Sequence, residues 1–472
     1  METKVGFFSI GLDTYWAQFE GLRDRLLGYH AQIGKRLAEK CEVVDAGLVD
    51  TPDKARAAAG LFADANIDVV FLFVSTYALS STVLPAIPKG AFVVVLNVQP
   101  VAQLDYAAFN AIGDRGVMTG IWLEHCQACS VPEIACVFNR AGVRYAFVTG
   151  WLQDPEMWRD VSGWLDAARA VGGMRANRMG VLGHYYCGML DVYSDLTALC
   201  AAFGTHIDLL EMCELQALRE GVTEEDVSAK IAEFRERFDV SASCEPEELD
   251  RAARTAIALD RLVAKHRLSS MAYYYEGQPG NAYENIVTSV IAGNTLLTGS
   301  HVPVAGECEV KNAHAMKLMD LLGAGGSFSE FYLTDFVDDV VLLGHDGPAH
   351  FAIAEGRVGL VPVPVYHGKP GKGLSIQMTV KHGPVTLLSV VQRADGSLML
   401  LAAEGESVPG PVLQIGNTNS RYRFPMGVKE FMRRWSMAGP AHHCAIGIGH
   451  VASKIKKMAF LLGIPVTDIC CE

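Results

Sequence analysis

Continuous apolar runs alternate with helix-like segments over the first two thirds of the chain. Such runs occur at KVGFFSI (4–10), IDVVFLFVS (67–75) and AFVVVLNVQP (91–100). Between them, segments such as DKARAAAGLFADAN (53–66) carry apolar residues at helical spacing. Strands that are apolar on both faces and are separated by helices are typical of a parallel sheet covered by helices on both sides. We therefore predict an α/β architecture for this part of the chain.

A second α/β unit is predicted to begin at NRMGVLGHYY (177–186) and to contain two acidic helices, 224–238 and 245–266. Thr223 and Ser243 precede these helices as expected N-caps. After about residue 340 the pattern becomes short, alternating segments divided by Gly and Pro, among them HFAIAEG (350–356) and VTLLSVVQRADG (385–396). This pattern predicts an antiparallel sheet or small barrel, followed by a final helix at 451–463.

The length of 472 residues exceeds what one ordinary hydrophobic core supports, so two or three domains are expected. The changes in pattern divide the chain into three. We predict an N-terminal α/β domain at 1–172, a central α/β domain at 173–323 and a C-terminal β-rich domain at 324–472.

Composition narrows the class of partner. A net charge of −13 argues against nucleic acids and anionic membranes, which both bind basic surfaces. No apolar run approaches the roughly 20 residues that span a bilayer, and the start METKVGFFSIGL lacks the pattern of a signal peptide. Twelve scattered cysteines favour reduced thiols and a cytoplasmic protein. Cys126 and Cys129 form a CxxC beside His125, which we interpret as buried thiols rather than a redox or zinc site.

In parallel α/β sheets, ligands bind beyond the carboxyl ends of the strands. This rule directs attention to the loops 11–19, 75–81, 97–103 and 123–133. Candidate substrate-binding residues in these loops are Tyr15, Trp16, Gln18, Gln127 and Cys129. For Tyr15, Trp16 and Gln18, ordinary loop packing is the alternative.

Acids and histidines in Gly-rich settings form the strongest candidate site. Glu307 and Glu330 follow Gly-rich segments, and His345 follows the apolar run VVLL. The later segment GPAHHCAIGIGH contains His442, His443 and His450. Carboxylate oxygens and imidazole nitrogens are ligands for divalent cations, so a metal site is predicted. Neither a P-loop nor a dinucleotide fingerprint is present.

These segments resemble one enzyme family. GECEVKNAHAMKLMDLL and SFSEFYLTDF resemble the L-arabinose isomerase segments that begin GEGDWKTA and SFMEDYTYHF. VVLLGHDG resembles the histidine-bearing strand end that follows in that family, and AHHCAIGIGH resembles the metal-histidine region shared by L-arabinose and L-fucose isomerases. The resemblance covers most of the chain.

The resemblance implies a metal-dependent aldose–ketose isomerase that works through an enediol. It implies that Glu307, Glu330, His345 and His443 bind one Mn²⁺-like cation, with Mg²⁺ and Co²⁺ as the other candidates. Glu307 and Glu330 would also be the acid/base pair, with His442 at the substrate. Tyr275 and His367 would lie near the sugar, and a homo-trimer or homo-hexamer would place active sites between subunits. Cys308 is expected to pack rather than to bind metal.

Two departures from the family leave the sugar open. The loop LEHCQACSVPEI replaces the family's NLNQTAHGGREF, so that Cys129 matches a substrate-binding histidine, and IGLDTYWAQFEG differs from the family's SQHLYG. The alternatives are an isomerase of the same superfamily for a modified or anionic hexose, such as a sulfo- or deoxy-sugar, a sugar-binding protein without turnover, and a zinc or cobalt hydrolase.

Overall fold

The computed structural model describes residues 4–277, 279–363 and 371–471. The chain folds as two compact units, Met1–Arg169 and Ala170–Glu472. The predicted domain boundary near residue 323 stays a prediction. Within the described residues, none of the helices is long and apolar enough to cross a bilayer.

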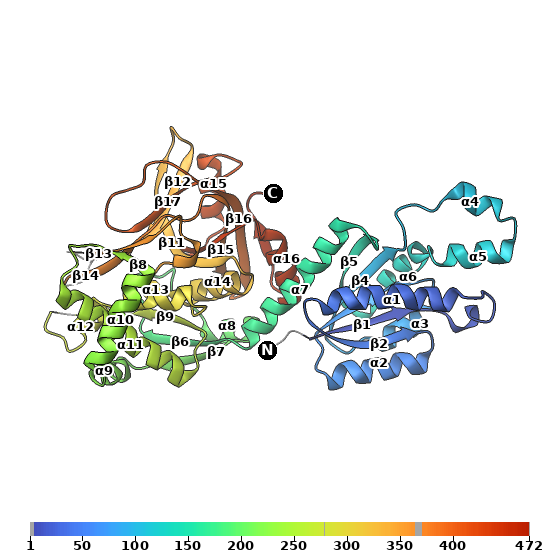
Figure 1. Cartoon of the computed structure of the whole chain (residues 1–472), viewed down its shortest axis with the longest axis horizontal. Helices are drawn as coiled ribbons and strands as arrows, with labels where there is room; N and C mark the ends of the chain where they lie inside the picture. The colour runs from blue at the N-terminus through green and yellow to red at the C-terminus, as the bar shows by residue number, and fades with distance from the viewer. Residues whose placement is uncertain (1–3, 278, 364–370, 472) are drawn as a thin grey trace. The chain divides into compact units, whose positions relative to one another are not determined.

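The first unit is a parallel sheet covered by helices (Figure 1). Its strand order is β2-β1-β3-β4-β5. The strands are β1 (Lys4–Ile10), β2 (Glu42–Val49), β3 (Val69–Phe73), β4 (Phe92–Gln99) and β5 (Arg144–Trp151). The helices are η1 (Asp13–Tyr15), α1 (Leu22–Ala38), α2 (Pro52–Asp64), α3 (Ser80–Val83), η2 (Leu84–Ala86), α4 (Tyr106–Ala111), α5 (Arg115–Leu123), α6 (Gln127–Ala141) and α7 (Pro155–Arg175), which continues past the unit's last residue. The α/β prediction is confirmed.

The second unit begins with another parallel sheet, of order β10-β9-β6-β7. Its strands are β6 (Arg178–Gly183), β7 (His206–Leu210), β9 (Ser270–Tyr274) and β10 (Val304–Ala305). The helices of this region are α8 (Leu196–Phe203), α9 (Met212–Glu220), α10 (Glu224–Arg237), α11 (Pro246–His266), α12 (Glu284–Val287), α13 (Ile291–Gly299), η3 (Gly306–Cys308) and α14 (Val310–Leu321).

A closed, six-stranded antiparallel barrel follows (Figure 1). Around it the strands run β15-β18-β11-β12-β17-β16, and β16 pairs back onto β15. The strands are β11 (Gly325–Asp335), β12 (Val340–His345), β15 (Gly383–Gln392), β16 (Leu398–Val408), β17 (Thr418–Arg423) and β18 (His443–Ile448), and β19 (Val466–Asp468) adds to β16 in parallel. A small sheet joins β8 (Phe238–Val240), β13 (Val358–Val363) and β14 (Gly373–Gln377), and the remaining helices are η4 (Phe351–Ile353), α15 (Val428–Met437) and α16 (Ala452–Leu462). The predicted β-rich C-terminal part and the final helix are confirmed.

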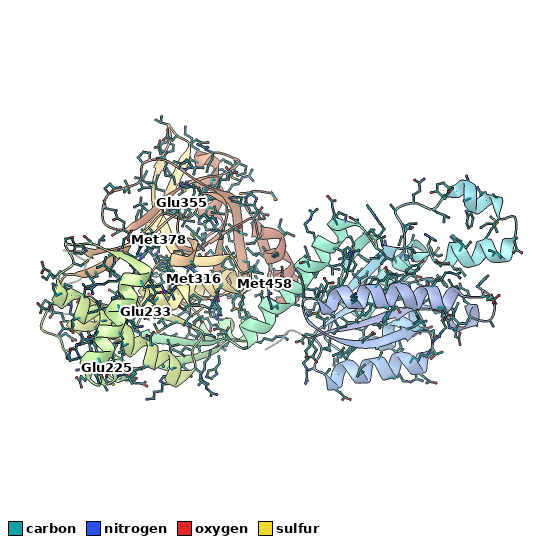
Figure 2. All side chains as sticks on the ribbon, viewed as in Figure 1. Glu225, Glu233, Met316, Glu355, Met378 and Met458 are labelled. Carbon is teal, nitrogen blue, oxygen red and sulfur yellow. The ribbon has the colours of Figure 1, made fainter. Side chains whose placement is uncertain are left out.

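Helix α14 packs against both the parallel sheet and the barrel of the second unit. It contacts β9 and β10 of the parallel sheet, and β11, β15 and β18 of the barrel. Every residue from Val310 to Met319 is buried, including Met316, which lies in the interior of the unit (Figure 2). A helix that is buried on all sides holds its first residues firmly in place. Glu307 lies just before this helix.

Three local predictions are wrong. The segment 350–356 was expected to be a strand, but it forms η4, because the N–H groups of Ile353 and Ala354 bond to carbonyls three residues back. Ser243 does not cap its helix. Glu245 is the N-cap, its side chain makes no cap bond, and Pro246 fills the first helical position with its preset φ. The expected loop 123–133 is largely helix α6.

Thr223 does cap α10, through a reciprocal pair of bonds with Asp226. The Thr223 hydroxyl accepts from the Asp226 N–H at 3.2 Å, and the Asp226 carboxylate accepts from the Thr223 N–H at 3.2 Å. Thr223→Ala is therefore expected to lower the free energy of unfolding by about 1 kcal/mol in urea titrations. Ser243→Ala is the matched control and should change it by less than about 0.5 kcal/mol. Equal effects of the two changes would contradict the capping assignment.

Candidate active site

The four predicted metal-binding residues meet where the rim of the barrel faces the end of β10. Glu330 on β11 pairs directly with His443 at the start of β18, and on its other side with Gly344 of β12. His345 is the last residue of β12, next to Gly344. Glu307 follows β10 in the turn that leads into α14. The antiparallel register therefore gathers residues that lie more than a hundred positions apart.

The backbone at Glu307 has an uncommon conformation. Its φ of 52° and ψ of 17° are in the left-handed region, and the next residue, Cys308, has a φ of 56°. A non-glycine residue in this region costs free energy and is found where the surrounding structure fixes it, often at functional sites. The buried helix α14 supplies that constraint here.

The Glu307 carboxylate lies among three imidazoles. Its Oε2 atom is 3.3 Å from His443 Nε2 and 3.5 Å from His442 Nε2. Its Oε1 atom is 3.9 Å from His345 Nε2. The Glu330 carboxylate approaches the same nitrogen of His442, with 3.9 Å between Oε2 and Nε2. Glu307 and Glu330 thus both face His442.

The same side chains fit a divalent cation. Glu307, His442 and His443 form one group of potential ligands, and Glu330, His345 and His443 form another, with the ligand atoms of each group within 4.8 Å of one another. Glu307 Oε2 and both ring nitrogens of His443 are buried without a hydrogen-bond partner. Buried polar atoms that lack partners are costly, and a cation shared between imidazoles and carboxylates would satisfy them.

The two carboxylates have opposite pKa shifts. Burial raises the pKa of Glu307, but His442 and His443 outweigh it and hold the pKa well below its ordinary value. Burial dominates at Glu330, and its pKa is raised. Burial also lowers the pKa of His345 to about 4, which keeps that imidazole neutral, as a metal ligand must be. At His442, burial is outweighed by Glu307 and Asp191, and the pKa is raised to about 9.

His345 needs one rearrangement before it can act as a ligand through Nε2. The Gly347 N–H donates to His345 Nδ1 at 2.7 Å. A neutral ring whose Nδ1 accepts a hydrogen bond carries its proton on Nε2, the atom that faces Glu307. Coordination through Nε2 therefore requires that the Gly347 contact is given up.

Three residues around the histidines were not predicted from the sequence. Asp191 Oδ2 accepts hydrogen bonds from His442 Nδ1 at 2.6 Å and from its backbone N–H at 3.0 Å. Glu309 is fully buried, with Oε2 at 3.7 Å from His443 Nδ1 and Oε1 at 3.1 Å from Lys311 Nζ. Lys311 in turn donates to the carbonyl of Asp191 at 2.8 Å. The second acid and the lysine of GECEVK were the available signal for Glu309 and Lys311.

A cavity of about 270 Å³ opens beside these groups. It lies beyond the carboxyl ends of β6, β9 and β10, where the rule for parallel sheets places ligands. Its lining comprises Tyr186, Met189, Tyr273, Tyr274, Val287, Val290, Ile291, Asn294, Gly306, Glu307, Glu330, His345, Asp346, Gly347 and Pro348. Such a mixture of apolar walls and a few convergent polar groups is typical of small-molecule sites.

Two of the predicted substrate-binding residues of the first unit, Tyr15 and Trp16, contact other side chains of that unit. Tyr15 and Trp16 pack on an apolar cluster that includes Leu22 and Leu123, and Trp16 Nε1 donates to Asp50 at 3.0 Å. Gln18 is exposed. Their part in substrate binding stays a prediction.

The two predicted residues of α6 differ in exposure. Gln127 is buried, and its amide donates to the carbonyls of Ser75 at 3.2 Å and Glu124 at 2.7 Å. Cys129 is exposed, whereas its CxxC partner Cys126 is buried. The prediction of buried thiols is therefore right for Cys126 and wrong for Cys129.

The remaining predicted residues of the second unit lie in different places. Tyr275 packs its ring against Tyr283 at 5.3 Å and directly follows Tyr274, one of the three tyrosines that line the cavity. His450 is in neither ligand group and bonds to the Gly405 carbonyl at 3.1 Å. Cys308 is buried, as expected for a packing residue, and burial raises the pKa of its thiol to about 12. His367 lies outside the described residues.

Several L-arabinose isomerases are similar in sequence to this chain. No family model matches the chain. An L-arabinose isomerase of Nocardioides sp. is 24% identical over 357 residues, which are 70% of this chain and 67% of the relative. L-arabinose isomerases of Bacillus subtilis and Acidothermus cellulolyticus are 20% and 21% identical, over 70% and 71% of this chain and 68% and 69% of their own lengths. The chain is therefore similar to L-arabinose isomerases over about 70% of its length.

Proposed function

We propose that this protein is a metal-dependent enzyme that interconverts an aldose and a ketose. The observation that carries the proposal is the cluster of Glu307, Glu330, His345 and His443, the first three of which line a cavity of about 270 Å³, in a chain similar to L-arabinose isomerases. Mn²⁺ is the proposed cation, because mixed oxygen and imidazole ligation suits it, with Mg²⁺ and Co²⁺ as alternatives. A cytoplasmic location and an assembly of three or six copies stay predictions from the sequence.

The proposed reaction moves one proton between C1 and C2 of the sugar and another between O1 and O2. Glu307 and Glu330 act as the acid/base pair, because both carboxylates face the same imidazole, that of His442, Glu307 from the turn after β10 and Glu330 from β11. The bound cation supplies Lewis-acid polarisation of the sugar oxygens. His442 holds a substrate hydroxyl through Nε2, since its Nδ1 is engaged by Asp191.

Ketose formation across a panel of sugars tests this proposal. The panel contains pentoses, 6-deoxyhexoses and anionic hexoses, and the protein is treated with EDTA and assayed with and without added Mn²⁺. Metal-dependent ketose formation from a member of the panel is the expected result. Tight Mn²⁺ binding without turnover of any sugar would contradict the proposed activity and favour a sugar-binding protein.

Asp191 is expected to be a positioning residue in this reaction. Its carboxylate accepts from His442 Nδ1 and so orients the ring with Nε2 directed at Glu307. Asp191→Asn should lower kcat roughly 10- to 100-fold, as for other outer partners of site histidines, with Mn²⁺ affinity almost unchanged. Asp195→Asn is the matched control, because Asp195 lies on the same loop but caps α8 by accepting from the Ala198 N–H at 3.0 Å. Equal losses in both variants would contradict a specific role for Asp191.

A further inference from the structure

The lining of the cavity contains two chemically different groups of residues. One group comprises the carboxylates and the imidazole of the proposed metal site, together with the third acid Asp346. The other group, the apolar wall, comes from the end of α12, the loop after it and the start of α13. Its residues include Val287, Val290 and Ile291, all at least 94% buried. A ligand in this cavity therefore meets both the acids and the apolar wall.

Asn294 interrupts this apolar wall. It lies on α13, one turn after Val290 and Ile291, and its side chain lines the cavity although only 1% of the residue is exposed. Its Oδ1 atom has no hydrogen-bond partner. The backbone of Asn294 is fully used, since its N–H donates to Val290 and its carbonyl accepts from Thr298. A buried side-chain amide with an unpartnered oxygen is costly unless a ligand supplies the missing hydrogen bond.

The charges around the cavity limit what that ligand is. Glu307, Glu330 and Asp346 all line it, and the described lining residues include neither Lys nor Arg. An anionic group on the substrate would find no Lys or Arg side chain among these lining residues to pair with it, and an unpaired charge is unfavourable in a partly desolvated site. A hydroxyl, in contrast, can donate to an amide oxygen and accept from an amide N–H.

We propose that Asn294 is a specificity-determining residue that hydrogen-bonds one hydroxyl of a neutral sugar against the apolar wall. This inference rests on the proposed function, because it assumes that the sugar binds with its reacting end at Glu307 and Glu330. A site built to bond a hydroxyl discriminates strongly against an analogue without it, because the site's own polar group is then left unpaired. Asn294 is thus the group that distinguishes a sugar from its singly deoxygenated analogue.

The test compares the turned-over sugar of the panel with analogues that each lack one hydroxyl. For the unmodified protein, kcat/KM is expected to be roughly 10- to 100-fold lower with one analogue than with the complete sugar, namely the analogue that lacks the hydroxyl bonded by Asn294. Asn294→Leu, which keeps a similar volume, should reduce that ratio to about twofold or less and leave the ratios at other hydroxyls and the Mn²⁺ affinity unchanged. Asn294→Ala provides the same comparison if the leucine variant does not fold.

Thr295→Val is the matched control. Thr295 is equally buried on the same helix, but its hydroxyl accepts from the Ala349 N–H at 3.3 Å and does not line the cavity. Thr295→Val should discriminate between the sugar and its deoxygenated analogues as strongly as the unmodified protein does. Discrimination that survives in Asn294→Leu, or that falls at every hydroxyl together, would overturn the proposal.

Failure of the proposed function is distinguishable from failure of this inference. If the unmodified, Mn²⁺-loaded protein converts no sugar of the panel, the isomerase proposal fails. Calorimetric binding of the same sugars and analogues then tests Asn294 directly, with the same loss of discrimination expected in Asn294→Leu. If no neutral sugar binds, or if an anionic hexose binds best, the proposal for Asn294 is wrong.

Discussion

Replacing Glu307 with glutamine is expected to lower kcat by about 10²–10⁴-fold, the range for loss of a positioned acid or base. The substitution keeps the size of the side chain and removes the charge that lies 3.3 Å from His443 and 3.5 Å from His442. Glutamine also has no carboxylate to take a proton from carbon. Steady-state kinetics with saturating Mn²⁺ measure the change.

An exposed glutamate of the same unit provides the control for this substitution. Glu225 lies in the first turn of α10, on the surface of the second unit (Figure 2). Glu225→Gln should leave kcat within about twofold of the unmodified value. Near-normal turnover by Glu307→Gln with Mn²⁺ bound would refute the role of Glu307 as acid or base.

Replacing His443 with glutamine is expected to weaken Mn²⁺ binding by at least about 100-fold, the upper end of the effect of losing an outer partner of a metal ligand. His443 is the residue common to both groups of potential ligands. Its ring is buried, with its centroid 4.4 Å from that of Phe328 and 3.8 Å from that of His442. A ligand at such a closely packed position is not readily replaced by a small movement of another side chain. Calorimetric titration with Mn²⁺ measures the loss.

His450→Gln is the matched control for this loss, because His450 belongs to the same sequence segment but bonds to the Gly405 carbonyl away from both groups. It should bind Mn²⁺ as the unmodified protein does. An unchanged Mn²⁺ affinity in His443→Gln, or an equal loss in His450→Gln, would show that the cation is bound elsewhere.

The parallel sheets were predictable because their strands are buried on both faces. Val69–Phe73 is buried at every position, and a short run of this kind between two helices is typical of a central strand in a parallel sheet. The barrel was predictable as a class, from short alternating strands, but its closure was not. Closure depends on the pairing of β15 with both β16 and β18, and pairing partners leave no mark in the spacing of apolar residues.

Segment 350–356 shows why local pattern fails at some places. HFAIAEG alternates as a strand would, yet within it the structure pairs only Ala354, in a single bridge to Val380. Without a longer ladder to bond to, the backbone of Phe351–Ile353 satisfies its polar groups locally, in a 3₁₀ turn. The CxxC segment is a similar case. The resemblance placed Cys129 in a loop, whereas the helix α6 begins at Gln127 and turns Cys129 outward.

The candidate site was predictable only in part for a different reason. The resemblance pointed to four residues because they lie in the matched motifs: Glu307, Glu330, His345 and His443. Asp191 and Asn294 belong to none of the matched motifs, and only the fold brings them close to the site. Asp191 lies 251 residues before the histidine that it holds. Contacts over such distances in sequence follow from topology, which the order of residues does not display.

Anomalous scattering from crystals grown with Mn²⁺ tests the central claim most directly, namely that four side chains from β11, β12, β18 and the turn after β10 share one cation. The expected result is a single strong peak within about 2.0–2.3 Å of oxygens of Glu307 and Glu330 and of nitrogens of His345 and His443, with the Gly347 contact to His345 broken. A peak that these residues do not surround, or one held by His442 in place of His345, would contradict it.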